Sequence, residues 1–304
     1  MPLTAGRYAP SPSGPLHIGN LRTAALAWAA ARSSGRQFRL RVEDLDPHRT
    51  GAADQQLWEL EQIGLDWDGP VVYQSQRLDL YHDALAQLDD HLFPCFCSRR
   101  DIREAASAPH VLPGHYPGTC RGLTAPPPGW DPARTPALRW RPTAAETTIH
   151  DRLHGDFTGP VDAVVLQRGD GVFAYNLAVV VDDVEMGVDQ VVRGGDLLGT
   201  SPAQAQITAA LGGPVPEYWH VPMVLNPAGQ RLAKRDGAVT WEELSAEGWT
   251  LEQLWSQFAS STGQQSATSA AEFLTHFNPD LIPTTDSQFS EEDGLKPHAD
   301  APRR

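Results

Sequence analysis

The sequence opens with a turn of small residues that stands directly before an alanine-rich run. The turn, RYAPSPSGPLHIGN, covers residues 7–20, and the run NLRTAALAWAAARSSG covers 20–35. Strong helix formers with apolar residues at helical spacing predict a helix from about Ile18, with Gly35 as its stop, after a short strand near 7–9. QFRLRVE at 37–43 predicts a second strand. Strand, helix and strand in this order are typical of an α/β fold with a parallel sheet.

The turn itself suits a phosphate group. A strand that passes through small residues into a helix brings main-chain N–H groups and the positive end of the helix dipole to one point. His17 stands at that point and can donate a hydrogen bond to phosphate oxygens. The spacing matches neither G-x-x-x-x-G-K-[ST] nor G-x-G-x-x-G, which disfavours a P-loop or a dinucleotide site. The alternative is an ordinary proline- and glycine-rich loop with a solvent-exposed histidine.

Residue composition and the spacing of apolar residues divide the chain into five parts. Residues 1–92 predict the first half of an α/β domain, with further helices at 53–64 and 77–92. Residues 93–160 are rich in cysteine, histidine, glycine and proline and predict an inserted subdomain, with strand character at 137–142. Residues 161–240 predict the second half, with two strands joined by a turn at 169–171 and a helix at 201–213. Residues 241–262 predict a short helical segment, and 263–304 a largely disordered tail in which AAEFLTHF at 270–277 could form one or two helical turns.

Composition limits the partners. The formal net charge of -14 disfavours non-specific binding to nucleic acid but allows a specific RNA contact. No apolar stretch approaches the ~20 residues that span a bilayer, and no signal-like segment begins the chain, so we expect a cytoplasmic protein without membrane contact. Three cysteines, an odd number, fit a reducing compartment better than a disulfide framework.

The cysteines could hold a metal ion. Cys95, Cys97 and Cys120 are too few for a four-cysteine zinc site, so a fourth ligand must supply oxygen or nitrogen. Tyr116 and two histidines, His110 and His115, lie nearby in the sequence. Coordination chemistry alone favours His115 over Tyr116 because imidazole binds zinc far more readily. The alternative is three buried thiols with no metal.

Two segments carry a resemblance to a known family. APSPSGPLHIGN resembles the HIGH signature of class I aminoacyl-tRNA synthetases, in the form found in the glutamyl enzymes, with Asn20 in place of the second histidine. RLAKR at 231–235 resembles their second signature, KMSKS, with Ala233 in place of serine. Lys234 and Lys296 are the only lysines of the chain, and a compact ammonium can follow a moving phosphate better than a planar guanidinium can.

The resemblance implies roles for single residues. His17 and Lys234 would be catalytic and stabilise charge as pyrophosphate leaves. Glu43 would face the substrate ammonium, and Arg7 would pair with a substrate carboxylate. The implied glutamate-binding set is Arg7, Ala9, Ser11, Glu43, Tyr175 and Arg193. The implied ATP-binding set is Pro10, Gly14, His17, Gly19, Asn20, Arg231 and Lys234.

The length after the second signature points to one branch of the family. Only about 70 residues follow it, fewer than the anticodon-reading region of glutamyl-tRNA synthetases needs. With the C-x-C…Y-x-x-x-C pattern, the chain resembles the glutamyl-queuosine tRNA(Asp) synthetases. That resemblance implies a Rossmann-like parallel sheet, an inserted zinc-stapled subdomain and a short helical C-terminal part. It implies a structural Zn²⁺ ligated by Cys95, Cys97, Tyr116 and Cys120.

The same resemblance implies the reaction. The enzyme would activate L-glutamate with ATP and Mg²⁺, without tRNA, and transfer it to queuosine in the anticodon of tRNA(Asp); we expect a monomer. One alternative is a catalytic fragment that charges the 3′ end of tRNA(Glu) or tRNA(Gln). A second, from another class, is a non-catalytic zinc-containing module that binds RNA.

Overall fold

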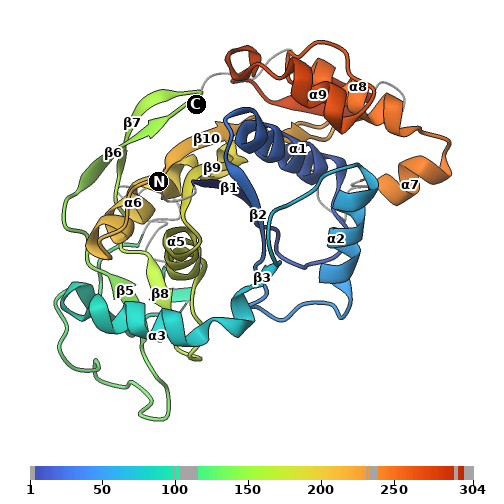
Figure 1. Ribbon diagram of the computed structural model, residues 1–304. Coiled ribbons are helices and arrows are strands. Elements are labelled where there is room, and N and C mark those ends of the chain that lie inside the picture. Colours follow the sequence, from blue (N-terminus) through green and yellow to red (C-terminus); the bar gives the residue numbers. More distant parts are fainter. Residues whose placement is uncertain are drawn as a thin grey trace.

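A seven-stranded sheet forms the centre of the protein (Figure 1). The computed structural model describes residues 4–98, 100–102, 116–230, 232, 239–290 and 294–297. The strand order is β3-β2-β1-β9-β10-β6-β7, in which neighbours from β3 to β6 run parallel and β7 is antiparallel to β6. The strands are β1 (Ala5–Tyr8), β2 (Gln37–Val42), β3 (Val72–Tyr73), β6 (Glu146–Asp151), β7 (Gly155–Pro160), β9 (Val188–Gly194) and β10 (Glu217–Val221). The predicted α/β class with a parallel sheet is confirmed.

The first strand–helix–strand unit forms as the sequence predicts. Helix α1 (Ile18–Ser33) packs against β1 and β9, and its alanines are almost completely buried. Small residues let the two main chains approach closely: a Cβ added at Gly6 of β1 would lie 2.9 Å from the Cβ of Ala31. Gly35 adopts a φ of +72°, a left-handed conformation that favours glycine after a helix.

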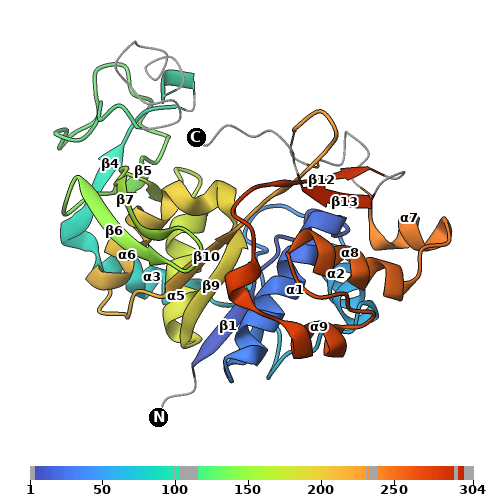
Figure 2. The ribbon, with the colours of Figure 1, turned by 90° about the horizontal axis from the view of Figure 1, so that it is seen from above.

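Helices cover both faces of the sheet (Figures 1 and 2). One apolar cluster joins α1 to the C-terminal helices, and another joins α3, α5 and α6 on the opposite face. The remaining helices are α2 (Ala52–Gln62), α3 (Leu78–Gln87), α5 (Tyr175–Glu185), α6 (Ser201–Ala210), α7 (Trp241–Ala246), α8 (Leu251–Ser261) and α9 (Ala270–His276). Short 3-10 turns lie at Gln74–Gln76, Asp89–His91, Gly195–Thr200 and Pro279–Leu281. None of the helices in the described ranges combines the length and apolar character needed to cross a bilayer.

The two faces of the central strands differ in chemistry. Phe38 and Leu40 of β2 and Val192 of β9 belong to the apolar cluster around α1. The alternate residues Arg41 and Arg193 point to the other face, where they contact α5 and α6. Because side chains alternate along a strand, one sheet offers an apolar surface to α1 and a row of arginines to α5 and α6.

The prediction of two strands within 162–183 is wrong for the second strand. Only Val165–Gln167 is a strand (β8), and Tyr175–Glu185 is helix α5. The run of valines favours a strand by local propensity, but that preference is weak and gives way to tertiary burial. As a helix, the segment buries Leu177 in the core and turns Asp182 and Asp183 toward Arg41 of the sheet.

The inserted subdomain has other bounds than predicted. A three-stranded antiparallel sheet, β4 (Leu92–Cys95), β5 (Ala137–Trp140) and β8, forms its base. Residues 146–160, which were expected within the insertion, instead form the β6–β7 hairpin at the edge of the central sheet. Aligning β6 beside β10 pairs main-chain groups that would otherwise stay unsatisfied.

The expected disordered tail over 263–304 is wrong for its described part. Helix α9 forms where the sequence allows one or two helical turns, but β12 (Ser287–Ser290) also joins β11 (Val224–Leu225) and β13 (Gly294–Pro297) in a small sheet, which was not expected. Phe273, Phe289 and Leu295 are buried in the same cluster as α1. Helix α9 contacts α1, and β13 packs on α8, so these apolar side chains extend the core around α1.

Candidate active site

His17 caps the first turn of α1. Its Nδ1 accepts hydrogen bonds from the main-chain N–H groups of Gly19 at 3.1 Å and Asn20 at 3.2 Å. A neutral imidazole that accepts at Nδ1 carries its proton on Nε2, which is therefore the donor side of the ring. A Cβ at Gly19 would lie 3.1 Å from the His17 ring, so glycine gives the ring room to cap the helix.

Buried side chains of α2 fix the turn before His17. Gln56 Nε2 donates to the carbonyl oxygens of Ser11 at 3.0 Å and Gly14 at 2.6 Å. Glu59 Oε2 accepts from the N–H of Leu16 at 2.7 Å. Both α2 side chains are buried, so the turn keeps one shape without a ligand. Neither residue was predicted from the sequence as part of the site. The feature that could have indicated them is a pair of polar residues, three positions apart, on the buried face of α2.

The segment after the second signature returns to the same helix end. The N–H of Ile18 donates to the carbonyl oxygen of Val239 at 3.0 Å, and His17 forms an isolated antiparallel bridge with Thr240. The strand before that signature is also adjacent, because a Cβ at Gly19 would lie 3.1 Å from the Cβ of Val224. Arg231 and Lys234 lie outside the described residues. Both flanks of their loop nevertheless meet the N-terminus of α1.

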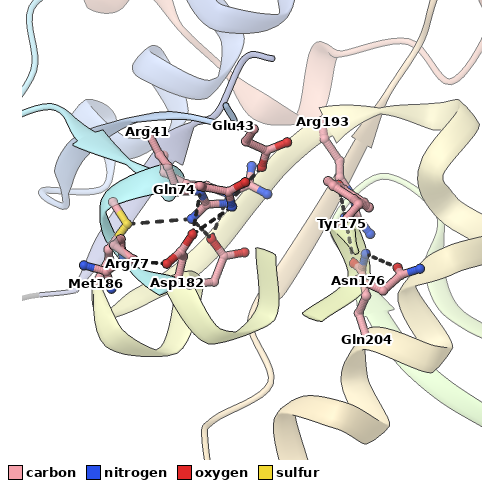
Figure 3. Close-up of polar contacts among 12 residues, drawn as sticks. Arg41, Glu43, Gln74, Arg77, Tyr175, Asn176, Asp182, Met186, Arg193 and Gln204 are labelled. Atoms are coloured by element: carbon pink, nitrogen blue, oxygen red, sulfur yellow. Dashed lines mark hydrogen bonds and ion pairs between the residues drawn. The ribbon is translucent and has the colours of Figure 1, made fainter. Parts of the chain in front are cut away.

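A buried ion network lies beside the turn, at the carboxyl ends of β1 and β2 (Figure 3). Arg41 Nη1 donates to Asp183 at 2.6 Å, and Arg41 Nη2 donates to Glu43 at 3.3 Å. Arg7 Nε donates to Asp183 at 3.3 Å. Asp182 accepts from Arg77 at 2.6 Å. Three guanidinium groups therefore face three carboxylates, and the network is close to neutral.

The carboxylates of Asp183 and Glu43 differ in their pKa. Burial alone would raise the pKa of Asp183, but Arg7 and Arg41 outweigh burial and hold that pKa below its usual range. Burial raises the pKa of Glu43 above its usual range, because Arg41 and Arg7 only partly compensate. A ligand ammonium would supply the missing compensation at Glu43. Its predicted role as acceptor for the ammonium is consistent with this chemistry.

Arg193 has a different environment from the other site arginines. It is 5% exposed, and in the described part of the chain no carboxylate pairs with it. Its partners are neutral: Gln204 Oε1 at 2.8 Å, Ser201 Oγ at 2.6 Å, Tyr175 Oη at 3.3 Å and His220 Nε2 at 3.1 Å. Figure 3 shows Tyr175 and Gln204 beside it. A buried cation without a counterion is unfavourable, so this position suits an anionic ligand.

These residues meet where the topology of the sheet reverses. The chain leaves β1 toward β2 on one side, and β9 joins β1 on the other. Ligands of α/β proteins bind at such a point, outside the carboxyl ends of the strands. Ala9, Pro10, Ser11 and Gly14 lie in the turn after β1, Glu43 directly follows β2, and Arg193 is near the end of β9. The structure thus brings together the described members of both predicted sets.

A second site lies in the insertion. The sulfur atoms of Cys95, Cys97 and Cys120 lie within 4.8 Å of one another. The phenolic oxygen of Tyr116 joins them, 3.6 Å from the Cys95 sulfur and 2.7 Å from the N–H of Cys120. Burial and the neighbouring Cys120 and Cys95 sulfurs raise the pKa of the Cys97 thiol to about 12. A cation would let the three sulfurs ionise together, so the cluster could hold a metal ion. His110 and His115 lie outside the described residues.

Comparison with known proteins identifies the family. The model of tRNA synthetases class I (E and Q), catalytic domain, matches residues 4–292. A protein of Nocardia farcinica named Glutamyl-Q tRNA(Asp) synthetase is 55% identical over 283 residues, which cover 92% of this chain and 91% of that protein. A protein of the same name from Geobacter sulfurreducens is 42% identical over an alignment of 308 positions, which covers 95% of this chain and 96% of the relative.

The fold leads to the same family. The crystal structure of a glutamate-tRNA synthetase from Elizabethkingia anophelis matches with a TM-score of 0.80 at 25% identity. The match covers 95% of this chain and 68% of that chain. A glutamate tRNA ligase from Elizabethkingia meningosepticum, solved in complex with its amino acid, matches with a TM-score of 0.79 at 26% identity, over 95% of this chain and 67% of that one. The chain therefore belongs to the class I tRNA synthetases (E and Q), within the family of the glutamyl-Q tRNA(Asp) synthetases.

Proposed function

We propose that this chain activates L-glutamate with ATP, without tRNA, and transfers the glutamyl group to queuosine in the anticodon of tRNA(Asp). The observation that carries the proposal is the buried Arg193 guanidinium, which has only neutral partners among the described residues, beside the under-compensated carboxylate of Glu43. L-Glutamate has one ammonium and two carboxylates. Glu43 accepts the ammonium, while Arg7 and Arg193 receive the carboxylates.

The first step is adenylation. An oxygen of the glutamate α-carboxylate attacks the α-phosphorus of ATP, and the bond to the departing pyrophosphate breaks. The His17 Nε2–H and the positive end of the α1 dipole face negative charge that grows on the phosphate. The N–H groups of Ile18, Gly19 and Asn20 are bonded within the protein. Lys234 follows the pyrophosphate, and Mg²⁺ bound with ATP would screen the polyphosphate. No protein nucleophile takes part, so the step needs position and charge only.

The second step is acyl transfer. A hydroxyl of the queuosine cyclopentene ring attacks the carbonyl carbon of the mixed anhydride, and AMP leaves. The sequence identity of 55% to the Nocardia relative, against 25% to the Elizabethkingia glutamate-tRNA synthetase, supports queuosine over a tRNA 3′ end as the acceptor.

The metal of the insertion is zinc in this proposal. Three thiolates and a phenolate are four ligands that suit tetrahedral zinc, and a closed set of four indicates a structural site. Tyr116 is preferred over His115 as the fourth ligand because its oxygen already lies beside the Cys95 sulfur. Bound zinc would tie Cys95 at the end of β4 to Cys120, across a part of the chain that has few apolar residues.

The test has two stages. ATP/pyrophosphate exchange is measured first with L-glutamate and no tRNA, and with L-aspartate and L-glutamine as controls. Exchange with glutamate alone is expected; no exchange would instead support a non-catalytic RNA-binding module. Purified tRNA(Asp), with and without queuosine, is then charged with radiolabelled glutamate. Label on the modified tRNA only is expected, whereas label on tRNA(Glu) or tRNA(Gln) would favour 3′-end charging.

A further inference from the structure

Arg193 is held in place on three of its nitrogen atoms. Its Nε donates to His220 Nε2 at 3.1 Å, Nη1 donates to Gln204 at 2.8 Å and Nη2 donates to Ser201 at 2.6 Å. Of these partners, His220 is the one attached to a further charged group. The ring is fully buried, and its Nδ1 lies 2.6 Å from Asp151 Oδ2.

The hydrogen bonds determine which nitrogen of His220 carries the proton. A guanidinium in a protein always donates, so Nε2 must accept from Arg193. The proton of the neutral ring is then on Nδ1 and is donated to Asp151. Burial lowers the pKa of His220, and the neighbouring Arg193 lowers it further, while Asp151 opposes both. The ring is accordingly neutral, and its Nε2 lone pair faces both Arg193 Nε and the Ser201 hydroxyl, each 3.1 Å away.

Asp151 is itself fixed by main-chain groups. It ends strand β6, and its Oδ1 accepts from the N–H groups of Leu153 at 2.9 Å and His154 at 3.0 Å. Its Oδ2 accepts from the N–H of His220 at 3.0 Å as well as from the ring. Asp151, His220 and Arg193 therefore form a buried chain from the β6–β7 turn to the ligand site.

The two arginines proposed to meet substrate carboxylates are held differently. Arg7 contacts the carboxylate of Asp183 directly, which offsets its charge. Arg193 has an imidazole between itself and the carboxylate of Asp151. A direct carboxylate partner would compete with an anionic substrate, whereas a neutral acceptor orients the guanidinium and leaves its charge available.

We propose that His220, whose tautomer is fixed by Asp151, is a positioning residue that orients Arg193 toward a carboxylate of the amino-acid substrate. The inference rests on the proposed glutamate activation. An arginine side chain that becomes ordered only on binding loses rotamer entropy, which weakens binding. The buried hydrogen bonds order Arg193 before the substrate binds, so binding does not carry this entropic cost. The effect should therefore appear in glutamate binding and not in ATP binding.

Two substitutions of His220 separate its contact with Asp151 from its contact with Arg193. His220→Asn places an amide near the Nδ1 position, which keeps the contact with Asp151 and loses the acceptor for Arg193. His220→Gln places an amide near the Nε2 position, which keeps an acceptor for Arg193. The matched control is His150→Asn, because His150 is an exposed histidine on β6 that contacts Asp156.

The measurement is glutamate-dependent ATP/pyrophosphate exchange, with thermal unfolding of each variant. For His220→Asn we expect the KM for glutamate to rise about 10- to 100-fold, the effect of losing a hydrogen bond to a charged group, with kcat and the KM for ATP within about twofold. His220→Gln should restore the KM for glutamate to within about threefold, and His150→Asn should match the wild type.

Other results overturn the inference. An unchanged KM for glutamate in His220→Asn would do so. So would equal rises in the KM for glutamate and the KM for ATP, in both His220→Asn and His220→Gln, that follow a loss of thermal stability. If the wild type shows no exchange, the proposed function and this inference fall together. Should the Asn variant not fold, ¹⁵N spectra of histidine-labelled wild-type protein decide, with the His220 signal assigned by its loss in His220→Gln. The Nδ1-protonated neutral ring is expected, and the Nε2-protonated form would overturn the proposal.

Discussion

The N–H of Ile18 donates a hydrogen bond to the carbonyl oxygen of Val239 at 3.0 Å, although 221 positions separate the two residues in the sequence. Ile18 is the first residue of α1, and Val239 is five residues after Lys234. The bond brings the end of the second signature loop to the helix that His17 caps. Two loops from opposite ends of the catalytic sequence thus meet at one helix N-terminus, where a triphosphate would bind.

Replacing Lys234 tests whether the two loops act together. We expect Lys234→Ala to lower glutamate-dependent ATP/pyrophosphate exchange by at least about 100-fold, because an ammonium that stabilises departing pyrophosphate acts mainly in the transition state. Lys296→Ala removes the only other lysine and is the matched control, with exchange close to that of the wild type expected. Unchanged exchange in Lys234→Ala would refute the role of this residue.

Replacing His17 separates its two roles. His17→Ala removes both the helix cap and the Nε2 donor, so we expect a loss of about 1 kcal/mol in the free energy of unfolding together with lower exchange. His17→Asn restores a good capping residue but not the donor. It should regain most of the stability, measured by urea unfolding, while kcat for exchange stays about 100-fold low.

The result that contradicts this assignment is specific. If His17→Asn recovers activity in proportion to its stability, the imidazole acts only as a cap. Catalytic donation from Nε2 is then excluded, and the α1 dipole and Lys234 remain to stabilise negative charge on the phosphates.

The part of the fold that local chemistry determines could be predicted. The turn at 7–20 combines rigid prolines, glycines and a following alanine run, and each of these acts through neighbours in the sequence. Helix α5 could not be predicted in the same way. Its three consecutive valines favour a strand, and only the arginines of β1 and β2, far away in the sequence, make a helix that presents Asp183 to them the better solution.

The polar residues that support the site were also missed. Gln56 and Glu59 have the composition of a solvated helix face, and His220 has the features of an ordinary strand residue. Their importance comes from burial and from partners more than 40 residues away, such as Leu16 for Glu59 and Asp151 for His220. A sequence pattern reports periodicity, and burial of a polar group is a property of the assembled fold.

Acidification should weaken glutamate binding before it unfolds the protein. The pKa of Glu43 is raised, so Glu43 takes up a proton at a higher pH than an ordinary glutamate does and then can no longer accept the ammonium. The pKa of Asp183 is lowered, so its stabilising pairs with Arg7 and Arg41 persist as the pH falls below the unfolded value and are lost only near the lower folded pKa. The KM for glutamate should therefore rise with falling pH while the thermal unfolding temperature is still high.

A glutamine at position 43 is the control for this pH effect. The substrate has a titrating side-chain carboxyl of its own, with a pKa of about 4.3, which contributes below that pH in every variant. Glu43→Gln should bind glutamate weakly and lose the part of the pH dependence that lies above about pH 4.3. Retention of the full wild-type profile in Glu43→Gln would assign the titration to another group.

Removal of the Tyr116 hydroxyl tests the proposed zinc site. We expect about one zinc ion for each wild-type chain, measured by mass spectrometry of the metal content. Tyr116→Phe keeps three thiolates and loses the phenolic oxygen, so its zinc should pass to a competing chelator at least about 10-fold more readily. Tyr73→Phe, on β3 of the central sheet, is the matched control and should hold zinc like the wild type.

The guanidinium of Arg139 makes this prediction sharper. It lies 3.9 Å from the centre of the Tyr116 ring, and the Cys120 N–H donates to the phenolic oxygen at 2.7 Å. Burial and the hydrogen bonds with Cys120 and Cys95 hold the pKa of Tyr116 above its usual value, and the Cys120 N–H opposes them only in part. A cation over the face of the ring favours a phenolate once a metal is bound. Arg139→Met should accordingly weaken zinc retention with all four ligands present. If Tyr116→Phe and Arg139→Met both hold zinc as tightly as the wild type, the fourth ligand is a different group, and His115 is then the first to be replaced.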